Sequence, residues 1–120
     1  MATAVRKNFE TPDETRQISD GQVEIVNLGD VTGMRGTFNP GWMWSTSVKP
    51  IAGTDSCQVN HIGYQFSGRL GVRLDDGSEV EYGPGDAYNI PPGHDAWVIG
   101  DEPVVSVDFR GGETFAKPQK

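Results

Sequence analysis

The chain has 120 residues, including 16 glycines and 8 prolines, and 35% of its residues are hydrophobic. A domain of this length buries roughly two-thirds of its unfolded surface, and the many glycines and prolines favour short strands and tight turns over a helical bundle. The net charge of −7 argues against nucleic-acid binding, which needs a basic patch, and against an anionic membrane surface. We therefore expect neither nucleic acid nor membrane among the partners.

The sequence also predicts the cellular compartment of the protein. Its apolar runs are shorter than the roughly 18 residues needed to cross a bilayer, and the N-terminal region lacks the apolar stretch of a signal peptide. The single cysteine, Cys57, cannot form an internal disulfide bond. These features predict a cytoplasmic protein.

The chain divides into an arm, a barrel and a tail. Residues 1–21 are charged and predict a loosely packed arm or one helical turn, and the polar residues 111–120 predict a frayed tail. Alternation broken by turn residues predicts strands over residues 22–28, 35–38, 41–50, 56–66, 69–74, 79–82, 87–90, 94–99 and 103–109. Short strands separated by frequent turns predict an all-β sandwich or barrel over residues 22–110.

Two details of this pattern concern the chain path. In residues 41–50, strand alternation places Trp42, Trp44, Thr46 and Val48 on one face, and the two tryptophans would form a large apolar wall. The strands on either side of Ser67 and Gly68 are predicted to pair as a hairpin.

The segment from Asp55 to Gly68 resembles the first motif of the cupin superfamily, whose members are double-stranded β-helix, or jelly-roll, barrels. The family motif has the form H-x-H-x-x-x-E-x-x-x-x-x-x-G. This chain keeps the spacing through Asp55, Cys57, His61 and Gly68, while all three ligand positions carry a different residue type. The positions of the family's metal site therefore transfer to this chain, but its three-histidine, one-glutamate ligand set does not.

The second cupin motif, G-x-x-x-x-x-P-x-G-x-x-H-x-x-x-N, is matched by Gly85, Pro91 and Gly93. Ala96 stands where the motif has its ligand histidine, and His94 lies two residues earlier. The chain resembles small single-domain bacterial cupins over most of its length. This resemblance implies an all-β cupin jelly-roll barrel and a homodimer.

The first hypothesis for the site is a divalent metal ion bound by Cys57, His61 and His94, with Asp55 or water completing the coordination. The barrel would also bind a small polar ligand, and an enzyme of this kind would be a metal-dependent oxygenase, isomerase or lyase. A thiolate and imidazoles favour Zn(II), with Fe(II), Mn(II) or Ni(II) as alternatives. An ideal strand would place Cys57 and His61 about 13 Å apart at roughly 3.3 Å per residue. The resemblance supports convergence, because the strands of a cupin barrel coil. The opposing interpretation is a buried apolar Cys57 and a hydrogen-bonded core histidine.

The second hypothesis is a metal-free enzyme, an isomerase or lyase, in which His61 is a general acid or base. Asp55, Asp95 or a buried tyrosine would tune its proton affinity, and Cys57 beside His61 would be a nucleophile in a variant of this hypothesis. The opposing interpretation of Asp95 is a solvated turn residue.

The third hypothesis is a non-catalytic sensing or regulatory module that binds a small molecule inside the barrel. Aromatic residues, Trp42 or Trp44 with Tyr88 and Trp97, would line an apolar pocket around a polar centre. Asp55 and Gln65 would contribute polar groups, because alternation places both on the same face as Cys57 and His61. The sequence leaves the ligand and the reaction open.

Overall fold

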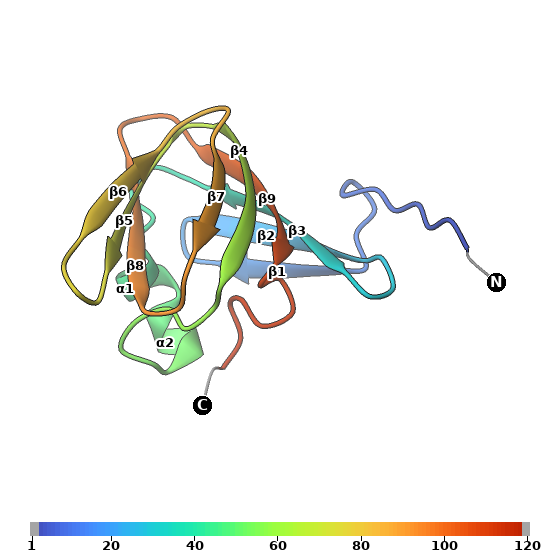
Figure 1. The fold of residues 1–120 in the computed structure, drawn as a ribbon, viewed down its shortest axis with the longest axis horizontal. Coiled ribbons are helices and arrows are strands. Elements are labelled where there is room, and N and C mark those ends of the chain that lie inside the picture. Colours follow the sequence, from blue (N-terminus) through green and yellow to red (C-terminus); the bar gives the residue numbers. More distant parts are fainter. Residues whose placement is uncertain (1–2, 119–120) are drawn as a thin grey trace.

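The computed structural model describes residues 3–118 and consists almost entirely of antiparallel strands (Figure 1). The strands are β1 (Glu14–Ile18), β2 (Gly21–Asn27), β3 (Thr32–Phe38), β4 (His61–Ser67), β5 (Arg69–Leu74), β6 (Glu79–Tyr82), β7 (Ala87–Ile90), β8 (His94–Ile99) and β9 (Val104–Arg110). Two one-turn helices, α1 (Trp44–Ser47) and α2 (Lys49–Ala52), precede β4. No helix among residues 3–118 has the length and apolarity to cross a membrane.

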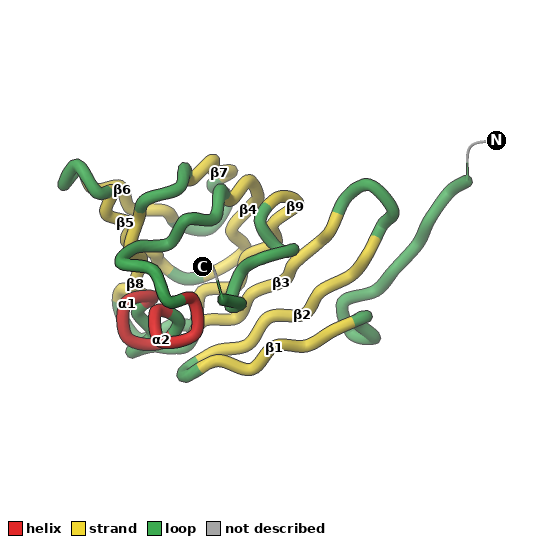
Figure 2. Tube along the Cα trace, turned by 90° about the horizontal axis from the view of Figure 1, so that it is seen from below, coloured by secondary structure: helices red, strands yellow, loops and turns green. Residues whose placement is uncertain are grey.

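The strands form two sheets that enclose one core. The larger sheet has the order β1-β2-β3-β9-β4-β7, and the smaller sheet has the order β6-β5-β8. Val23 and Met34 from the larger sheet and Val72 from the smaller sheet are almost fully buried in the same cluster. The two sheets therefore curl around a shared interior, which confirms the predicted all-β jelly-roll barrel (Figures 1 and 2).

The strand predicted over residues 41–50 is wrong, because this segment forms helices α1 and α2 (Figure 2). Trp44, Val48 and Ala52 are buried, while Thr46, which alternation assigned to the same face, is exposed. Burial at every fourth residue is the helical period, and two tryptophans in a short window also fit strand alternation. Pro50 in the first turn of α2 is compatible with a helix start.

The hairpin predicted around Ser67 and Gly68 is also wrong, because β4 pairs with β7 and β9, whereas β5 pairs with β6 and β8. The chain crosses from one sheet to the other at this point. Gly68 has a φ of 76°, and a Cβ atom there would lie 2.5 Å from the carbonyl oxygen of Pro103. This close approach explains why the crossing requires glycine.

Within residues 3–118, both terminal segments contain more packed structure than the sequence predicts. Part of the expected N-terminal arm forms β1, which pairs antiparallel with β2 along its whole length. In the expected frayed tail, Phe115 and Ala116 are buried against the barrel. The sequence did not indicate this packing, because both segments contain few apolar residues. One strand pairing and one buried aromatic side chain are nevertheless enough to order a short terminal segment.

Candidate functional site

Three side chains from different parts of the barrel meet in its interior. Cys57 lies in the loop before β4, His61 is the first residue of β4 in the larger sheet, and His94 is the first residue of β8 in the smaller sheet. All three are buried, and one ligand atom of each lies within 4.8 Å of the others. A backbone bridge joins Cys57 to His94, in which the Cys57 N–H donates to the His94 carbonyl at 2.7 Å.

The imidazole of His61 is oriented by a buried carboxylate. Its Nδ1 lies 2.7 Å from Oδ2 of Asp108, which is only 3% exposed, and Tyr88 donates its hydroxyl hydrogen to the other oxygen of the same carboxylate. A carboxylate accepts hydrogen bonds, so Nδ1 carries the hydrogen and Nε2 of a neutral His61 presents its lone pair. That Nε2 lies 3.7 Å from Sγ of Cys57.

The imidazole of His94 is oriented by the backbone. Its Nδ1 lies 2.7 Å from the carbonyl oxygen of Pro91, which can only accept a hydrogen bond. Nδ1 therefore carries the hydrogen, and Nε2 of neutral His94 is the free nitrogen. The two histidine rings lie edge to face with their centroids 5.4 Å apart.

These donors fit a divalent metal ion. In a tetrahedral zinc site with Zn–S near 2.3 Å and Zn–N near 2.0–2.1 Å, a sulfur and a nitrogen lie about 3.6 Å apart. Sγ of Cys57 and Nε2 of His61 are 3.7 Å apart, which matches this edge. Two imidazoles and one thiolate are also a ligand set that zinc commonly takes, and three protein ligands leave a position for water or substrate.

The same contacts shift the proton affinities of Cys57 and His61 in opposite directions. Burial disfavours the thiolate, but the interactions with His61 and His94 together outweigh burial and lower the pKa of Cys57 to about 6. Burial also disfavours the imidazolium, but hydrogen bonds to Asp108 and Cys57 raise the pKa of His61 to about 9. In the absence of metal, this geometry favours a thiolate–imidazolium pair near neutral pH.

Tyr88 completes the polar network as a hydrogen-bond donor. Burial and the negative charge of Asp108 raise its pKa well above the ordinary value, so the phenol keeps its hydrogen. The Asp108 carboxylate is thus held from two sides, by His61 and by Tyr88.

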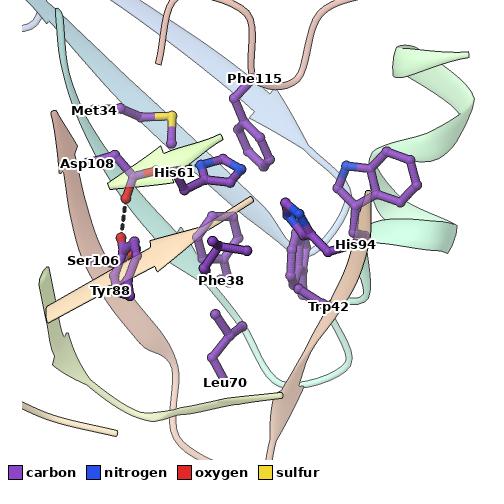
Figure 3. A pocket seen from close by; sticks show the side chains of 13 residues that line it. Met34, Phe38, Trp42, His61, Leu70, Tyr88, His94, Ser106, Asp108 and Phe115 are labelled. Atoms are coloured by element: carbon purple, nitrogen blue, oxygen red, sulfur yellow. Dashed lines mark hydrogen bonds and ion pairs between the residues drawn. The ribbon is translucent and has the colours of Figure 1, made fainter. Parts of the chain in front are cut away.

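A small cavity of about 40 Å³ lies beside the two histidines (Figure 3). Its walls are mainly apolar, and its lining residues are Met34, Phe38, Trp42, Trp44, His61, Leu70, Tyr88, Ile90, His94, Ala96, Ser106, Asp108 and Phe115. The indole Nε1 of Trp42 is buried and has no hydrogen-bond partner. A water molecule needs about 10–15 Å³ on this measure, so the cavity has room for about three waters or a very small ligand.

Known structures resemble this arrangement of strands. A Rhizobium leguminosarum protein of unknown function matches with a TM-score of 0.64 and 20% identity, over 91% of this chain and 99% of that one. The oxalate decarboxylase of Lactobacillus farciminis, in a formate complex, matches with a TM-score of 0.63 and 15% identity. A mutant of the Bacillus subtilis oxalate decarboxylase matches with a TM-score of 0.59 and 24% identity.

The fold is cupin-like. The chain covers 34% of the L. farciminis decarboxylase and 29% of the B. subtilis one, whereas the alignment spans 93% and 86% of this chain. No family model matches the sequence, and no curated protein is similar to it at a significant level. At these identities the likeness concerns the fold alone.

In this cupin-like barrel, the predicted ligand positions have different environments. Cys57 and His61 lie inside with His94, but the Asp55 side chain is fully exposed and lies 4.0 Å from the ammonium of Lys49. Burial alternates over Cys57, Val59 and His61, but the pattern does not extend back to Asp55, which lies in a bend at residues 54–56. Asp55 is therefore not positioned to complete the coordination.

The remaining predicted site residues fall into two groups. Trp44 and Tyr88 line the cavity. Gln65 is buried outside the lining, where its amide donates to the carbonyls of Gly68 and Tyr82, and the indole of Trp97 packs across Gly71.

Asp95, predicted as an acid–base partner of His61, has a structural environment. Its Oδ1 accepts hydrogen bonds from the backbone N–H groups of Ser45 and Ala96. The first of these contacts joins β8 to the first turn of α1. The interpretation as a solvated turn residue fits no better, because one oxygen of the carboxylate accepts two backbone hydrogen bonds.

Sequence reasoning missed Asp108, Ser106 and Phe115. A signal for the first two exists in the strand VVSVDFR, in which Val104, Ser106 and Asp108 share the inward face. Two polar residues on the buried face of a strand indicate a polar network inside the barrel. Phe115 has no comparable signal, because it lies in a polar tail.

Proposed function

We propose that this protein binds a divalent metal ion, with zinc favoured, through Cys57, His61 and His94 and presents it to a small molecule inside the barrel. The observation that carries this proposal is the convergence of three buried ligand atoms within 4.8 Å. Both histidines support it, because each Nδ1 hydrogen is held by an acceptor and each Nε2 is left as a ligand. Fe(II), Mn(II) and Ni(II) are alternatives for the same site.

The bound ion would supply Lewis-acid polarisation of a ligand oxygen or an activated water molecule. The protein's own groups have separate tasks. Asp108 holds His61 in the tautomer that presents Nε2, and the Pro91 carbonyl does the same for His94. The apolar walls around the histidines exclude bulk water, which strengthens electrostatic interactions inside the cavity.

The cavity also indicates the kind of ligand. Its walls are mostly aromatic and aliphatic, and Trp42 offers a buried N–H without a partner. A buried donor is stabilised when an acceptor reaches it. We therefore propose a compact ligand with a hydrogen-bond-accepting oxygen, such as a short-chain carboxylate or carbonyl compound. This ligand class is narrower than the small polar ligand that the sequence predicts.

Elemental analysis of the purified protein tests the metal site. We expect about one divalent metal ion per chain, lost in Cys57→Ser and in His61→Ala. Asp55→Asn is the matched control, because Asp55 belongs to the first-motif positions but lies on the surface, and it should retain the metal. Metal-free wild-type protein whose melting temperature is unmoved by added zinc would contradict the proposal.

A second function is favoured by the contact between Cys57 and His61. A thiolate paired with an imidazolium that is held by Asp108 is the arrangement of an activated nucleophile or acid–base pair. This metal-free enzyme is preferred if elemental analysis and zinc titration are both negative. Catalysis lost in His61→Ala with retained fold would then support it, and ligand binding without turnover would support a sensing module.

The acceptor-bearing ligand can be tested with acetate as the probe. Trp42→Phe keeps an aromatic wall but removes the donor, so we expect the acetate dissociation constant of the zinc-loaded protein to rise about tenfold. Trp97→Phe is the control, because Trp97 lies outside the cavity. Acetamide in place of acetate distinguishes a charged carboxylate from a neutral carbonyl. Equal acetate affinity in Trp42→Phe and wild type would contradict the role of the indole.

We also propose a homodimer in the cytoplasm. Support for the dimer comes from apolar side chains on the outer face of two paired strands, Tyr64 and Phe66 on β4 and Phe109 on β9, which are 42–56% exposed. Such a patch commonly marks an association surface. Sedimentation of the wild type beside Phe66→Asp tests it, and a monomeric wild type would contradict it.

A further inference from the structure

The segment after β9 turns back over the end of the barrel instead of leaving it. Gly111 has a φ of 107°, and the N–H groups of Thr114 and Phe115 donate to its carbonyl oxygen. A Cβ atom on Gly111 would lie 2.7 Å from the carbonyl oxygen of Asn60. Residues 111–118, which we call the C-terminal cover, therefore begin in close contact with the loop that leads into β4.

Phe115 is the part of the C-terminal cover that reaches the site. Its side chain lines the cavity and is 4% exposed, and its ring meets the His61 ring edge to face with centroids 5.3 Å apart (Figure 3). It also meets Phe38 at a centroid distance of 6.2 Å. A single aromatic side chain thus forms one wall of the cavity next to a proposed metal ligand.

Arg16 on β1 fastens the C-terminal cover from the other side. Its Nη1 donates to the carbonyl oxygens of Gly112 at 2.8 Å and of Phe115 at 2.6 Å. The Glu14 carboxylate accepts from Nε and Nη2, which fixes the guanidinium in this orientation. Arg16 is not a lining residue of the cavity, so it can affect the site only through the cover.

The small size of the cavity makes the position of the Phe115 side chain important for ligand entry. About 40 Å³ admits about three water molecules, so a larger ligand would need one of the lining side chains, such as Phe115, to move. The cover forms no strand pairing, and local segments of this kind open more readily than strands in a sheet.

We propose that the C-terminal cover is a gate in which Phe115 determines the size of ligand that enters and Arg16 is the positioning residue that holds the gate closed. This inference rests on the proposed function only in identifying the cavity as the ligand site. It does not depend on the identity or the presence of the metal, and a readout on the metal-free protein can therefore test it separately.

Alkylation of Cys57 in the metal-free, full-length protein provides that readout, since Cys57 is the single cysteine, is 1% exposed and lies beside His61. The rate is measured with iodoacetamide and with the bulkier N-ethylmaleimide. We expect Phe115→Ala and Arg16→Met to accelerate alkylation about tenfold or more, because the closed state loses an aromatic contact or two charge-assisted hydrogen bonds. Phe115→Ala should also reduce the preference for the smaller reagent.

Matched controls separate the gate from a general loss of stability. Val80→Ala shortens an exposed valine on β6, and Arg69→Met removes an exposed arginine that pairs with Glu81, so neither should change the rate more than about twofold. If Phe115→Ala does not fold, Phe115→Leu takes its place with Arg16→Met. Equal rates in wild type, Arg16→Met and the Phe115 variant would overturn the gate, as would equal acceleration in the controls. Failure of the metal site would show only in elemental analysis.

Discussion

The two histidines of the site are held in the same tautomer by different means. His61 donates to a buried carboxylate, Asp108, whereas His94 donates to a backbone carbonyl, that of Pro91. Both contacts measure 2.7 Å, so distance does not distinguish them. The difference is electrostatic: the Asp108 side adds a negative charge that Tyr88 and His61 share, and the Pro91 side adds only a dipole.

This difference indicates that the orientation of the His61 ring depends on neighbouring side chains, whereas the orientation of the His94 ring depends on the backbone conformation. On the His61 side, a substitution at one of its partners can change charge without moving backbone. On the His94 side, orientation follows from the Pro91–Gly93 turn, so only a change in that turn can alter it. The two halves of one site should therefore respond differently to substitution.

Removal of each imidazole should reveal the largest difference in stability between the His61 side and the His94 side. In the metal-free protein, His61→Ala leaves the Asp108 carboxylate buried with one partner fewer, and we expect a loss of about 3 kcal/mol in the free energy of unfolding. His94→Ala leaves one carbonyl without its partner and should lose about 1–2 kcal/mol. Urea denaturation measures both. Equal losses would show that the Asp108 charge is compensated by Tyr88 alone.

Asp108→Asn should weaken metal binding at the proposed site while His61 is still present. Loss of an outer carboxylate that orients a ligand histidine typically reduces metal affinity about 10–100-fold. Competition with a chromophoric chelator gives the zinc dissociation constant. Tyr88→Phe, which removes the second partner of Asp108 but not the carboxylate, should have a smaller effect in the same direction. An unchanged affinity in Asp108→Asn would mean that packing alone orients His61.

Gly93→Ala tests the other side through the backbone. Gly93 has a φ of 90°, and a Cβ atom there would lie 2.8 Å from a carboxylate oxygen of Asp75. We expect a loss of about 1–2 kcal/mol in stability from the left-handed conformation. A rise in the zinc dissociation constant should accompany it, because the turn positions His94. Gly77→Ala is the control, since Gly77 has a similar φ of 92° but a Cβ atom there would have no other atom within 4 Å.

The smallest effect concerns the titration of Cys57 without metal. Its pKa is lowered to about 6, so the thiolate should be present above this pH and lost as the pH falls through it. Asp108→Asn weakens the imidazolium of His61 and should move the midpoint upward, toward the ordinary value for cysteine. The ultraviolet absorbance of the thiolate measures the midpoint. Gly93→Ala should change it less, and a wild-type midpoint near the ordinary value would contradict the pairing of Cys57 with His61.

The sequence predicted the barrel well because each strand is indicated by residues close together in the chain, through the alternation of apolar and polar side chains and through the glycines of the turns. It also named Cys57, His61 and His94 as a group, although only the resemblance to cupins, and not strand geometry, supported their convergence. The structure explains it: residues 56–60 leave the strand conformation, so the spacing of an ideal strand does not apply to Cys57.

Other parts of the site depend on tertiary contacts that local patterns do not record. Asp55 shares the spacing of the cupin motif, but it lies before the point where β4 begins and stays in solvent. Residues 41–50 satisfy strand alternation at Trp42 and Trp44, yet the structure buries Trp44, Val48 and Ala52, which are spaced at the helical period. Phe115 was missed because a single aromatic residue in a polar tail indicates no partner until the opposite strand, with Arg16, is in place.

The backbone bridge between Cys57 and His94 has a consequence for how such a site can change during evolution or by design. Main-chain groups fix the separation of these two positions, through the Cys57 N–H to the His94 carbonyl and the Gly93 N–H to the Cys57 carbonyl, each at 2.7 Å. The side chain at position 57 can therefore be exchanged while its anchoring point stays in place. A histidine there would replace the soft sulfur donor of the proposed site with a nitrogen donor, and because imidazole suits zinc, copper, iron and nickel, we expect a single substitution to broaden the range of metal ions that this position accepts.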